Sequence, residues 1–171
     1  YYRLSGTALE QAEEKKRQWR LLEAQVALAL AHDLPLMIHC RPARGTMDAY
    51  HDLLAYLEPK RKENPSLRGN VHFFVGDVPT ATRFWEMGFT TSFTGVLTFT
   101  HDYDAVVRAA PLYMLLTETD CPFVAPVPFR GKRNEPAHVK YVVEAIARIR
   151  HEDPEVVRAA TVVNAQRAFA F

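Results

Sequence analysis

Three side chains that suit a divalent metal ion stand at the ends of apolar stretches in this sequence. His39 and His72 lie at or near the ends of two predicted strands, and Asp120 follows a later strand. Because the carboxyl ends of parallel strands meet on one side of a sheet or barrel, we expect these three side chains to converge there. Two imidazoles and a carboxylate form a mixed nitrogen and oxygen ligand set, which binds Zn²⁺, Mn²⁺ or a similar ion. Strand alternation places Glu118 on the same side as Asp120, where its carboxylate would orient a metal ligand.

Each of these residues also has an explanation without a metal. A single histidine in a strand is more often hydrogen-bonded in the core than bound to an ion, and Asp120 precedes Cys121, in a sequence that suits a turn. Spacing alone therefore leaves both explanations open. The remaining histidines fall on predicted helices or at helix ends and are interpreted as surface or structural residues; they are His32, His51, His101, His138 and His151.

The elements that would hold these residues alternate between strand and helix. Short apolar segments predict four strands, at residues 34–38, 70–75, 89–94 and 113–118. Helical periodicity predicts six helices, at residues 7–33, 46–62, 79–87, 102–110, 136–151 and 154–169. Strands that alternate with helices indicate βαβ units and a parallel sheet, so we expect one α/β domain over residues 1–171. This length is too short for a closed (β/α)8 barrel, which typically needs roughly 250 residues.

A loop rich in proline and basic residues follows the last predicted strand. Residues 121–136 contain several prolines, and a connection of this length is usually functional. The same loop carries three basic residues, Arg130, Lys132 and Arg133. These three charges are also explained as a solvated surface of the loop.

Composition excludes several classes of protein. The 171 residues carry a formal net charge of +1 and are 48% hydrophobic, which excludes a disordered chain and a polybasic, histone-like protein. The two cysteines, Cys40 and Cys121, lie far apart and form no CxxC zinc motif, so we expect two reduced, partly buried thiols. No apolar run reaches the roughly 20 residues of a membrane span, and we expect a cytoplasmic protein without a membrane partner.

Six segments of the sequence resemble, in the same order, motifs of the TatD family of metal-dependent deoxyribonucleases. The most specific matches are Glu-Thr-Asp, which ends at Asp120, and Arg-Gly-Lys-Arg-Asn-Glu-Pro, which begins at Arg130. Together the similar segments extend over essentially the whole chain; they are Leu34–Arg41, Val71–Gly76, Ser92–Gly95, Leu115–Phe123, Ala125–Pro136 and Asn164–Phe169.

The resemblance implies a fold, a reaction and a role for each of the residues above. The family fold is a TIM-like barrel, and the family reaction is the metal-dependent hydrolysis of phosphodiesters in DNA, often from the 3′ end. His39 and His72 match the ligands of one divalent metal ion, and Asp120 matches the catalytic carboxylate on a second ion. In such two-metal sites, ions such as Mg²⁺, Mn²⁺ or Zn²⁺ stabilise the attacking and leaving oxygens. DNA is then the expected substrate, and the basic loop residues are its expected phosphate contacts.

Part of the family pattern has no counterpart in this chain. The family begins with a His-x-His pair and has a metal-bridging Glu in a motif resembling Gly-Glu-Ile-Gly-Leu-Asp-Tyr-Tyr; Tyr1–Arg3 resembles the end of that motif. We therefore expect the C-terminal part of a TatD-type hydrolase, a partial TIM-like (β/α) barrel without its N-terminal strands. Its two-metal site would be incomplete and would hold one ion or none, so the chain alone would have little nuclease activity.

Two other functions are compatible with the sequence. In the first, the chain is a non-catalytic remnant of the fold and acts as a binding or structural module. Alternatively, it belongs to a metal-dependent hydrolase of amides, lactones or phosphotriesters, because one fold serves many reactions. The sequence leaves open the identity of the metal, the choice between DNA and RNA, the direction of cleavage and the oligomeric state.

Overall fold

Four parallel strands form a sheet in the order β1-β2-β3-β4. The computed structural model describes residues 4–170; Tyr1–Arg3, with their resemblance to a family motif, and residue 171 lie outside the described residues. Helices alternate with the strands, so the prediction of an α/β fold with a parallel sheet is confirmed. The strands are β1 (Leu36–His39), β2 (Gly69–His72), β3 (Thr90–Phe93) and β4 (Leu115–Thr117).

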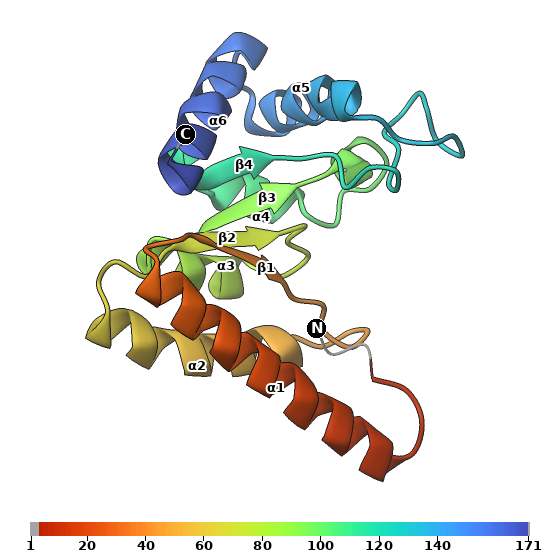
Figure 1. The fold of residues 1–171 in the computed structure, drawn as a ribbon. Coiled ribbons are helices and arrows are strands. Elements are labelled where there is room, and N and C mark those ends of the chain that lie inside the picture. Colours follow the sequence, from red (N-terminus) through yellow and green to blue (C-terminus); the bar gives the residue numbers. More distant parts are fainter. Residues whose placement is uncertain (1–3, 171) are drawn as a thin grey trace.

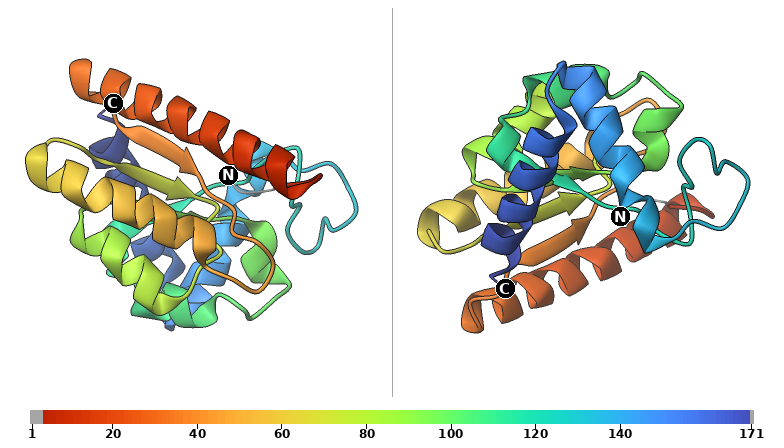
Figure 2. Two further views of the ribbon diagram at one scale, coloured as in Figure 1. Left: turned by 90° about the horizontal axis from the view of Figure 1, so that it is seen from below. Right: turned by 90° about the horizontal axis from the view of Figure 1, so that it is seen from above.

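Helices connect and flank the strands. Figure 1 shows α1 and α2 beyond the β1 side of the sheet, and α5 and α6 beyond the β4 side. The strands point toward the side on which the loop of residues 121–135 projects, which the two views in Figure 2 also show. The helices are α1 (Ala8–Ala31), α2 (Asp48–Glu63), α3 (Val78–Glu86), α4 (Asp104–Ala109), α5 (Val139–Arg150) and α6 (Pro154–Phe169), with short 3-10 helices η1 (Gly95–Thr98), η2 (Leu112–Met114) and η3 (Pro136–His138).

Strands β1 and β2 pair in a register that places His39 beside His72. At the start of this pair Leu36 lies beside Gly69, and a side chain at the glycine would meet the Leu36 carbonyl oxygen at 2.5 Å. The absence of a side chain at Gly69 therefore lets the two strands approach. Strand β2 is shorter than predicted because Phe73 has a left-handed φ of 47°, which ends the extended chain directly after His72.

A cluster of buried aromatic rings joins the sheet to helices α2 and α3. The rings of Tyr50, Phe84 and Phe93 all lie near that of Phe74, with centroids 5.0, 6.3 and 6.4 Å away, and none of the four is accessible to solvent. The Tyr50 hydroxyl also accepts a hydrogen bond from the backbone N–H of Val75 at 3.0 Å. Because aromatic side chains bury large apolar areas, this cluster anchors the helices to the sheet.

Side-chain caps define where two of the helices begin. At the start of α1, the Thr7 hydroxyl accepts a hydrogen bond from the N–H of Glu10, and the Glu10 carboxylate accepts one from the N–H of Thr7. At the start of α3, the Asp77 carboxylate accepts a hydrogen bond from the N–H of Thr80 at 2.9 Å. These caps satisfy N–H groups that have no partner within the helix, and so they stabilise its first turn.

Helix α1 packs less tightly than the sequence predicts. Leu9, Val26 and Leu28 recur at helical spacing in the sequence, which predicts one apolar face. Val26 is buried, as is Ala29, but Leu9 and Leu28 are 70% and 49% exposed. A groove of about 460 Å³ lies between α1 and β1 and is lined mainly by apolar side chains, Leu22 among them. Within residues 4–170, β1 pairs only with β2, so α1 covers an open edge of the sheet and not its centre.

The two cysteines differ in exposure, and both are free thiols. Cys40 is buried directly after β1, whereas Cys121 is exposed. The prediction of a partly buried thiol is wrong for Cys121, because the chain turns away from the sheet at Asp120, whose φ is 52°. No helix in the described part of the chain is both long and apolar enough to cross a membrane.

Candidate functional site

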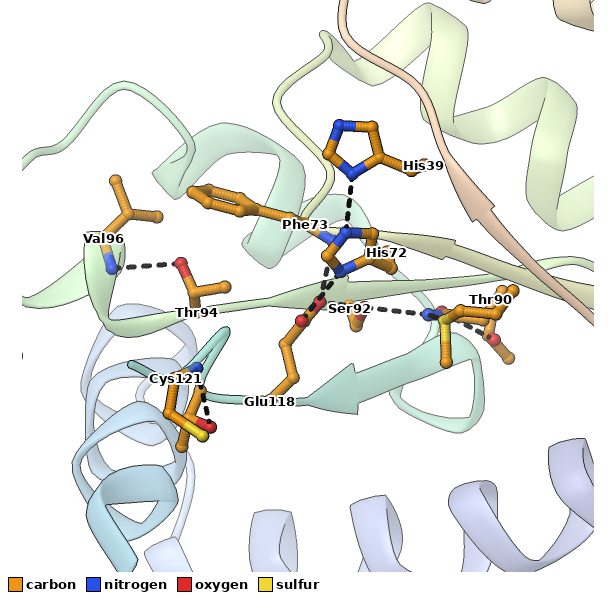
Figure 3. Close-up of polar contacts among 12 residues, drawn as sticks. His39, His72, Phe73, Thr90, Ser92, Thr94, Val96, Glu118 and Cys121 are labelled. Atoms are coloured by element: carbon orange, nitrogen blue, oxygen red, sulfur yellow. Dashed lines mark hydrogen bonds and ion pairs between the residues drawn. The ribbon is translucent and has the colours of Figure 1, made fainter. Parts of the chain in front are cut away.

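His39 and His72 end two neighbouring strands and face each other. Because they are register partners in parallel strands, their side chains leave the same face of the sheet at the same height. Nδ1 of His39 and Nε2 of His72 lie 2.9 Å apart, within hydrogen-bond distance, as Figure 3 shows. The sheet thus brings two of the three predicted metal ligands into contact.

Glu118 contacts His72 on its other ring nitrogen. Oε2 of Glu118 lies 2.9 Å from Nδ1 of His72, and Oε1 accepts a hydrogen bond from the backbone N–H of Phe73 at 2.7 Å. Since Glu118 follows β4 and His72 ends β2, the carboxylate reaches across β3 to the histidine (Figure 3). The predicted role of Glu118, to orient a metal ligand, requires such a contact between its carboxylate and the histidine.

The charges of this group of residues depend on their contacts. Burial raises the pKa of Glu118, but hydrogen bonds from His72, Ser92 and the Phe73 backbone together leave this pKa below its usual value. The hydrogen bond to Glu118 raises the pKa of His72 against the opposing effect of burial. Burial and the neighbouring His72 lower the pKa of His39. The proton between Glu118 and His72 is therefore held on the histidine, and His39 favours the neutral form that binds metals.

Asp120 lies near the histidine pair and is half-buried on the turn after β4. Burial raises the pKa of its carboxyl group, and the charges of His72, Glu118 and His39 also act on that pKa. Among residues 4–170, no three His, Cys, Asp or Glu side chains are grouped closely enough to hold a metal ion. The structure thus pairs the two histidines and leaves Asp120 beside them, outside ligand contact.

One buried amide fixes the loop that follows Asp120. The Asn134 side chain is 2% exposed, and its Nδ2 donates hydrogen bonds to the carbonyl oxygens of Thr119 at 2.8 Å and Phe123 at 2.6 Å. Its Oδ1 accepts a hydrogen bond from the backbone N–H of Glu135 at 2.9 Å. Asn134 therefore closes the loop onto the residues on either side of Asp120.

The three basic residues predicted to contact phosphate lie on this loop. Arg130 turns back onto the protein, with its guanidinium carbon 3.7 Å from the centre of the Phe99 ring and Nη1 donating to the Ala125 carbonyl oxygen at 3.3 Å. Lys132 and Arg133 are exposed to solvent. Arg130 is also exposed, so the structure holds its guanidinium against Phe99 and leaves all three basic residues accessible to a ligand.

Comparison with known proteins identifies the family of this chain. The family model described as TatD related DNase matches residues 6–170. The chain belongs to the TatD family. It is 40% identical over 157 residues to YabD of Bacillus subtilis, a protein named as an uncharacterized metal-dependent hydrolase. YcfH of Escherichia coli, named in the same way, is 34% identical over 159 residues.

Solved structures related to this TatD chain have the same fold. The crystal structure of YjjV, a TatD homolog from Escherichia coli, aligns with a TM-score of 0.79 at 29% identity and covers 91% of this chain. A TatD-family hydrolase from Entamoeba histolytica aligns over 99% of this chain with a TM-score of 0.73 at 20% identity, which shows the fold alone. The predicted family and the TIM-barrel-like architecture are confirmed.

The chain spans little more than half of the TatD relatives that it matches. The matched segments cover 91% of this chain and 58% of YabD, and 92% of this chain and 57% of YcfH. The aligned region of YjjV is 57% of that chain. The residues of this chain are therefore compared with one part of each relative.

Three polar residues near the histidine pair were not predicted from the sequence. Asn70, Thr90 and Ser92 lie on β2 and β3, and all three are buried. They form a hydrogen-bonded row that ends at Glu118. Their signal in the sequence is small: polar residues within two short strands that are otherwise suited to the core.

The histidine pair fits the metal ion that a TatD site implies. With bonds of about 2.0–2.1 Å, two nitrogen ligands of a tetrahedral Zn²⁺ ion lie ~3.3 Å apart. Nδ1 of His39 and Nε2 of His72 are 2.9 Å apart, so a small rotation of the rings gives ligand spacing. His72 also has a carboxylate, that of Glu118, on its other nitrogen, as metal-binding histidines usually do.

Proposed function

We propose that this chain carries part of the active site of a metal-dependent phosphodiesterase that acts on DNA. The observation that carries the proposal is the contact between His39 and His72 at the strand ends, with Glu118 behind His72. A carboxylate on the far ring nitrogen of a histidine is typical of histidines that bind a metal ion. The description of the matched family model, TatD related DNase, supports DNA as the substrate.

In this proposal His39, His72 and Asp120 are the metal ligands, and Asp120 is also the catalytic carboxylate. A bound divalent ion, Mg²⁺, Mn²⁺ or Zn²⁺, supplies Lewis acidity to the phosphoryl group. Glu118 accepts a hydrogen bond from Nδ1 of His72 and so keeps the lone pair of Nε2 directed toward His39.

The described residues supply an incomplete donor set for a two-metal site. Among residues 4–170, no three potential ligands are grouped, and the His-x-His pair and bridging Glu of the family pattern have no counterpart in the sequence. We therefore propose that these 171 residues by themselves bind a metal ion weakly and cleave DNA slowly.

The loop of residues 121–135 would contact the substrate. Lys132 and Arg133 are exposed on it, and Arg130 presents its guanidinium over Phe99. Basic side chains bind backbone phosphates without reading the bases, so this contact would not depend on DNA sequence. A cytoplasmic location and a single domain, both predicted from the sequence, belong to the same proposal.

Metal binding and DNA cleavage by the 171-residue chain test this function. We expect calorimetry to detect binding of Mn²⁺ and His72→Ala to weaken it at least about tenfold, because the ion loses a ligand that Glu118 orients. His32→Ala is the matched control, since His32 is exposed at the end of α1. We expect slow cleavage of a fluorescent oligodeoxynucleotide that requires Mn²⁺ and stops when EDTA is added.

Other outcomes of these measurements assign the chain to another class. DNA binding without cleavage and without any effect of metal would identify a non-catalytic binding module. Hydrolysis of lactones, amides or phosphotriesters, with DNA and an RNA of equal sequence left intact, would identify a different hydrolase. The proposal fails if the chain binds none of Mn²⁺, Mg²⁺ and Zn²⁺.

A further inference from the structure

A row of buried polar side chains crosses the sheet behind the histidine pair. Asn70, Thr90 and Ser92 are 1%, 4% and 3% exposed. Strands of parallel sheets are usually rich in apolar residues, because a buried polar group is destabilising unless it finds a hydrogen-bond partner. Hydrogen bonds join these side chains to one another, and the row ends at Glu118. Thr90, Ser92 and Glu118 are labelled in Figure 3.

The donors and acceptors along this row run in one direction. Asn70 donates from Nδ2 to Oγ of Ser92 at 2.9 Å and accepts at Oδ1 from the Thr90 hydroxyl at 3.0 Å. A serine hydroxyl has a single proton, and Ser92 already accepts from Asn70. The proton of Ser92 is therefore directed to Oε1 of Glu118, 2.5 Å away.

This arrangement divides the two oxygens of the Glu118 carboxylate between different partners. Oε1 receives the Ser92 hydroxyl and the backbone N–H of Phe73. Oε2 is then the oxygen that faces Nδ1 of His72. Because an ionised carboxylate only accepts hydrogen bonds, Nδ1 of His72 must be the donor.

We propose that Asn70 and Ser92 are positioning residues that act on His72 through Glu118. They hold the carboxylate so that His72 keeps its proton on Nδ1 and presents an unprotonated Nε2 toward His39. The inference rests on the proposed function and deepens it, because a histidine binds a divalent ion through an unprotonated nitrogen. It assigns a task to two buried side chains that lie in neighbouring strands.

The tautomer of His72 in the metal-free chain tests the proposal without any reaction. Protonated and unprotonated ring nitrogens differ widely in ¹⁵N chemical shift, so a ¹⁵N-histidine-labelled chain at about pH 9, where imidazoles are neutral, shows where the proton lies. We expect a single tautomer with the proton on Nδ1. Ser92→Ala and Asn70→Ala should give both tautomers, and Ser92→Thr, which keeps the hydroxyl, should restore one. Ser66→Ala, at an exposed loop position, is the matched control.

Glu118→Gln is a second variant with an opposite expected result. The glutamine oxygen would take the place of Oε1, beside the donors from Ser92 and Phe73, and the amide nitrogen would then donate to Nδ1 of His72. We expect the His72 proton to move to Nε2. Ser92→Ala in the same chain should abolish this inversion, because nothing would then orient the amide. The dispersion of the backbone amide spectrum verifies that each variant is folded.

Two results would overturn the proposal. One is a wild-type chain in which His72 is protonated on Nε2, and the other is a folded Ser92→Ala variant that keeps the single wild-type tautomer. If both alanine variants unfold, Glu118→Gln decides, and an unchanged Nδ1 tautomer in it overturns the proposal. Mn²⁺ binding separates this inference from the proposed function: we expect Glu118→Gln to weaken it about 10- to 100-fold. A wild-type chain that shows the expected tautomer but binds no metal would refute the function and leave the positioning role supported.

Discussion

The centre of the sheet is packed more firmly than its margin, where we define the centre as residues 48–150 and the margin as residues 8–40. In the centre, α5 buries six of its 12 residues, whereas α1 in the margin buries two of its 24. Within residues 4–170, strands β2 and β3 are each paired on both sides, whereas β1 in the margin is paired on one side, as is β4 at the far end of the sheet. Side chains are therefore buried more completely in the centre than in the margin.

The two histidines lie on opposite sides of this boundary. His72 belongs to the centre, where Glu118 contacts it and the buried Ser92 contacts Glu118. His39 belongs to the margin and has an exposed side chain at the end of β1. The distance between the two rings therefore depends on how firmly β1 stays paired with β2.

Thiol labelling should show the largest contrast, and it reports opening of the margin. Burial raises the pKa of Cys40 to about 12, so at pH 8 only about one Cys40 thiol in 10⁴ is ionised. Cys121 is exposed and serves as the internal reference. We expect iodoacetamide to modify Cys121 at least about 10³-fold faster than Cys40, as followed by mass spectrometry of peptides. Comparable rates in the folded chain would show that β1 detaches from the sheet.

Truncation of a side chain should lower the free energy of unfolding far more in the centre than in the margin. Phe74→Ala removes a ring that is inaccessible to solvent and lies against three others, and we expect the free energy of unfolding to fall by about 3–5 kcal/mol. Leu28→Ala, on the half-exposed face of α1, should change it by less than about 0.5 kcal/mol. Urea denaturation measures both, and equal losses would contradict the comparison.

Asn134→Ala should loosen the loop beside the site. The variant removes every side-chain hydrogen bond of Asn134 and leaves the carbonyl oxygens of Thr119 and Phe123 and the N–H of Glu135 without this partner, a loss of about 1–3 kcal/mol in the free energy of unfolding. We also expect faster proteolysis within residues 121–135. Asn64→Ala is the matched control, because Asn64 donates a single side-chain hydrogen bond, to the carbonyl oxygen of Lys60. Unchanged proteolysis in Asn134→Ala would show that the loop is held by other contacts.

Loss of a helix cap should lower the free energy of unfolding least of all. The loss should be larger for a cap in the centre than for the cap of α1. Asp77→Ala should cost about 1 kcal/mol, and Thr7→Ala less, because the first turn of α1 can fray without opening the core. The hydrogen bond from Thr80 lowers the pKa of Asp77 in the folded chain. The carboxylate therefore contributes fully above its unfolded pKa of about 3.9, and the contribution is lost as pH falls through the lower folded pKa. Stability of the wild type and Asp77→Ala should converge in acid, while Asp77→Asn, an uncharged cap, should not show this loss.

The sequence predicts the order of the elements better than their ends. Alternating apolar segments and helical repeats are local features, and the parallel sheet follows from them. The end of β2 depends on the backbone of Phe73, and the late start of β4 on a turn of 3-10 helix at residues 112–114. The exposure of Leu28 could not be predicted either, because periodicity shows that a helix has an apolar face and does not show what covers it.

The site divides in the same way between local and long-range information. His39 and His72 were predictable as strand ends, since neighbouring parallel strands place their last residues side by side. The contact of Glu118 with Phe73 joins residues 45 positions apart, and that of Asn70 with Ser92 joins residues 22 apart. Such pairs leave no periodic signal in the sequence, so only the folded chain shows them.

Because β1 and β2 pair in a fixed register, the number of residues in β1 determines where His39 lies relative to His72. Because side chains alternate between the two faces of a strand, inserting one residue between Leu36 and His39 would turn the imidazole toward the helices. Inserting two would restore the face but move the ring by ~6.6 Å along the strand, beyond reach of His72. The length of this short strand therefore fixes both the face and the position from which the imidazole reaches His72.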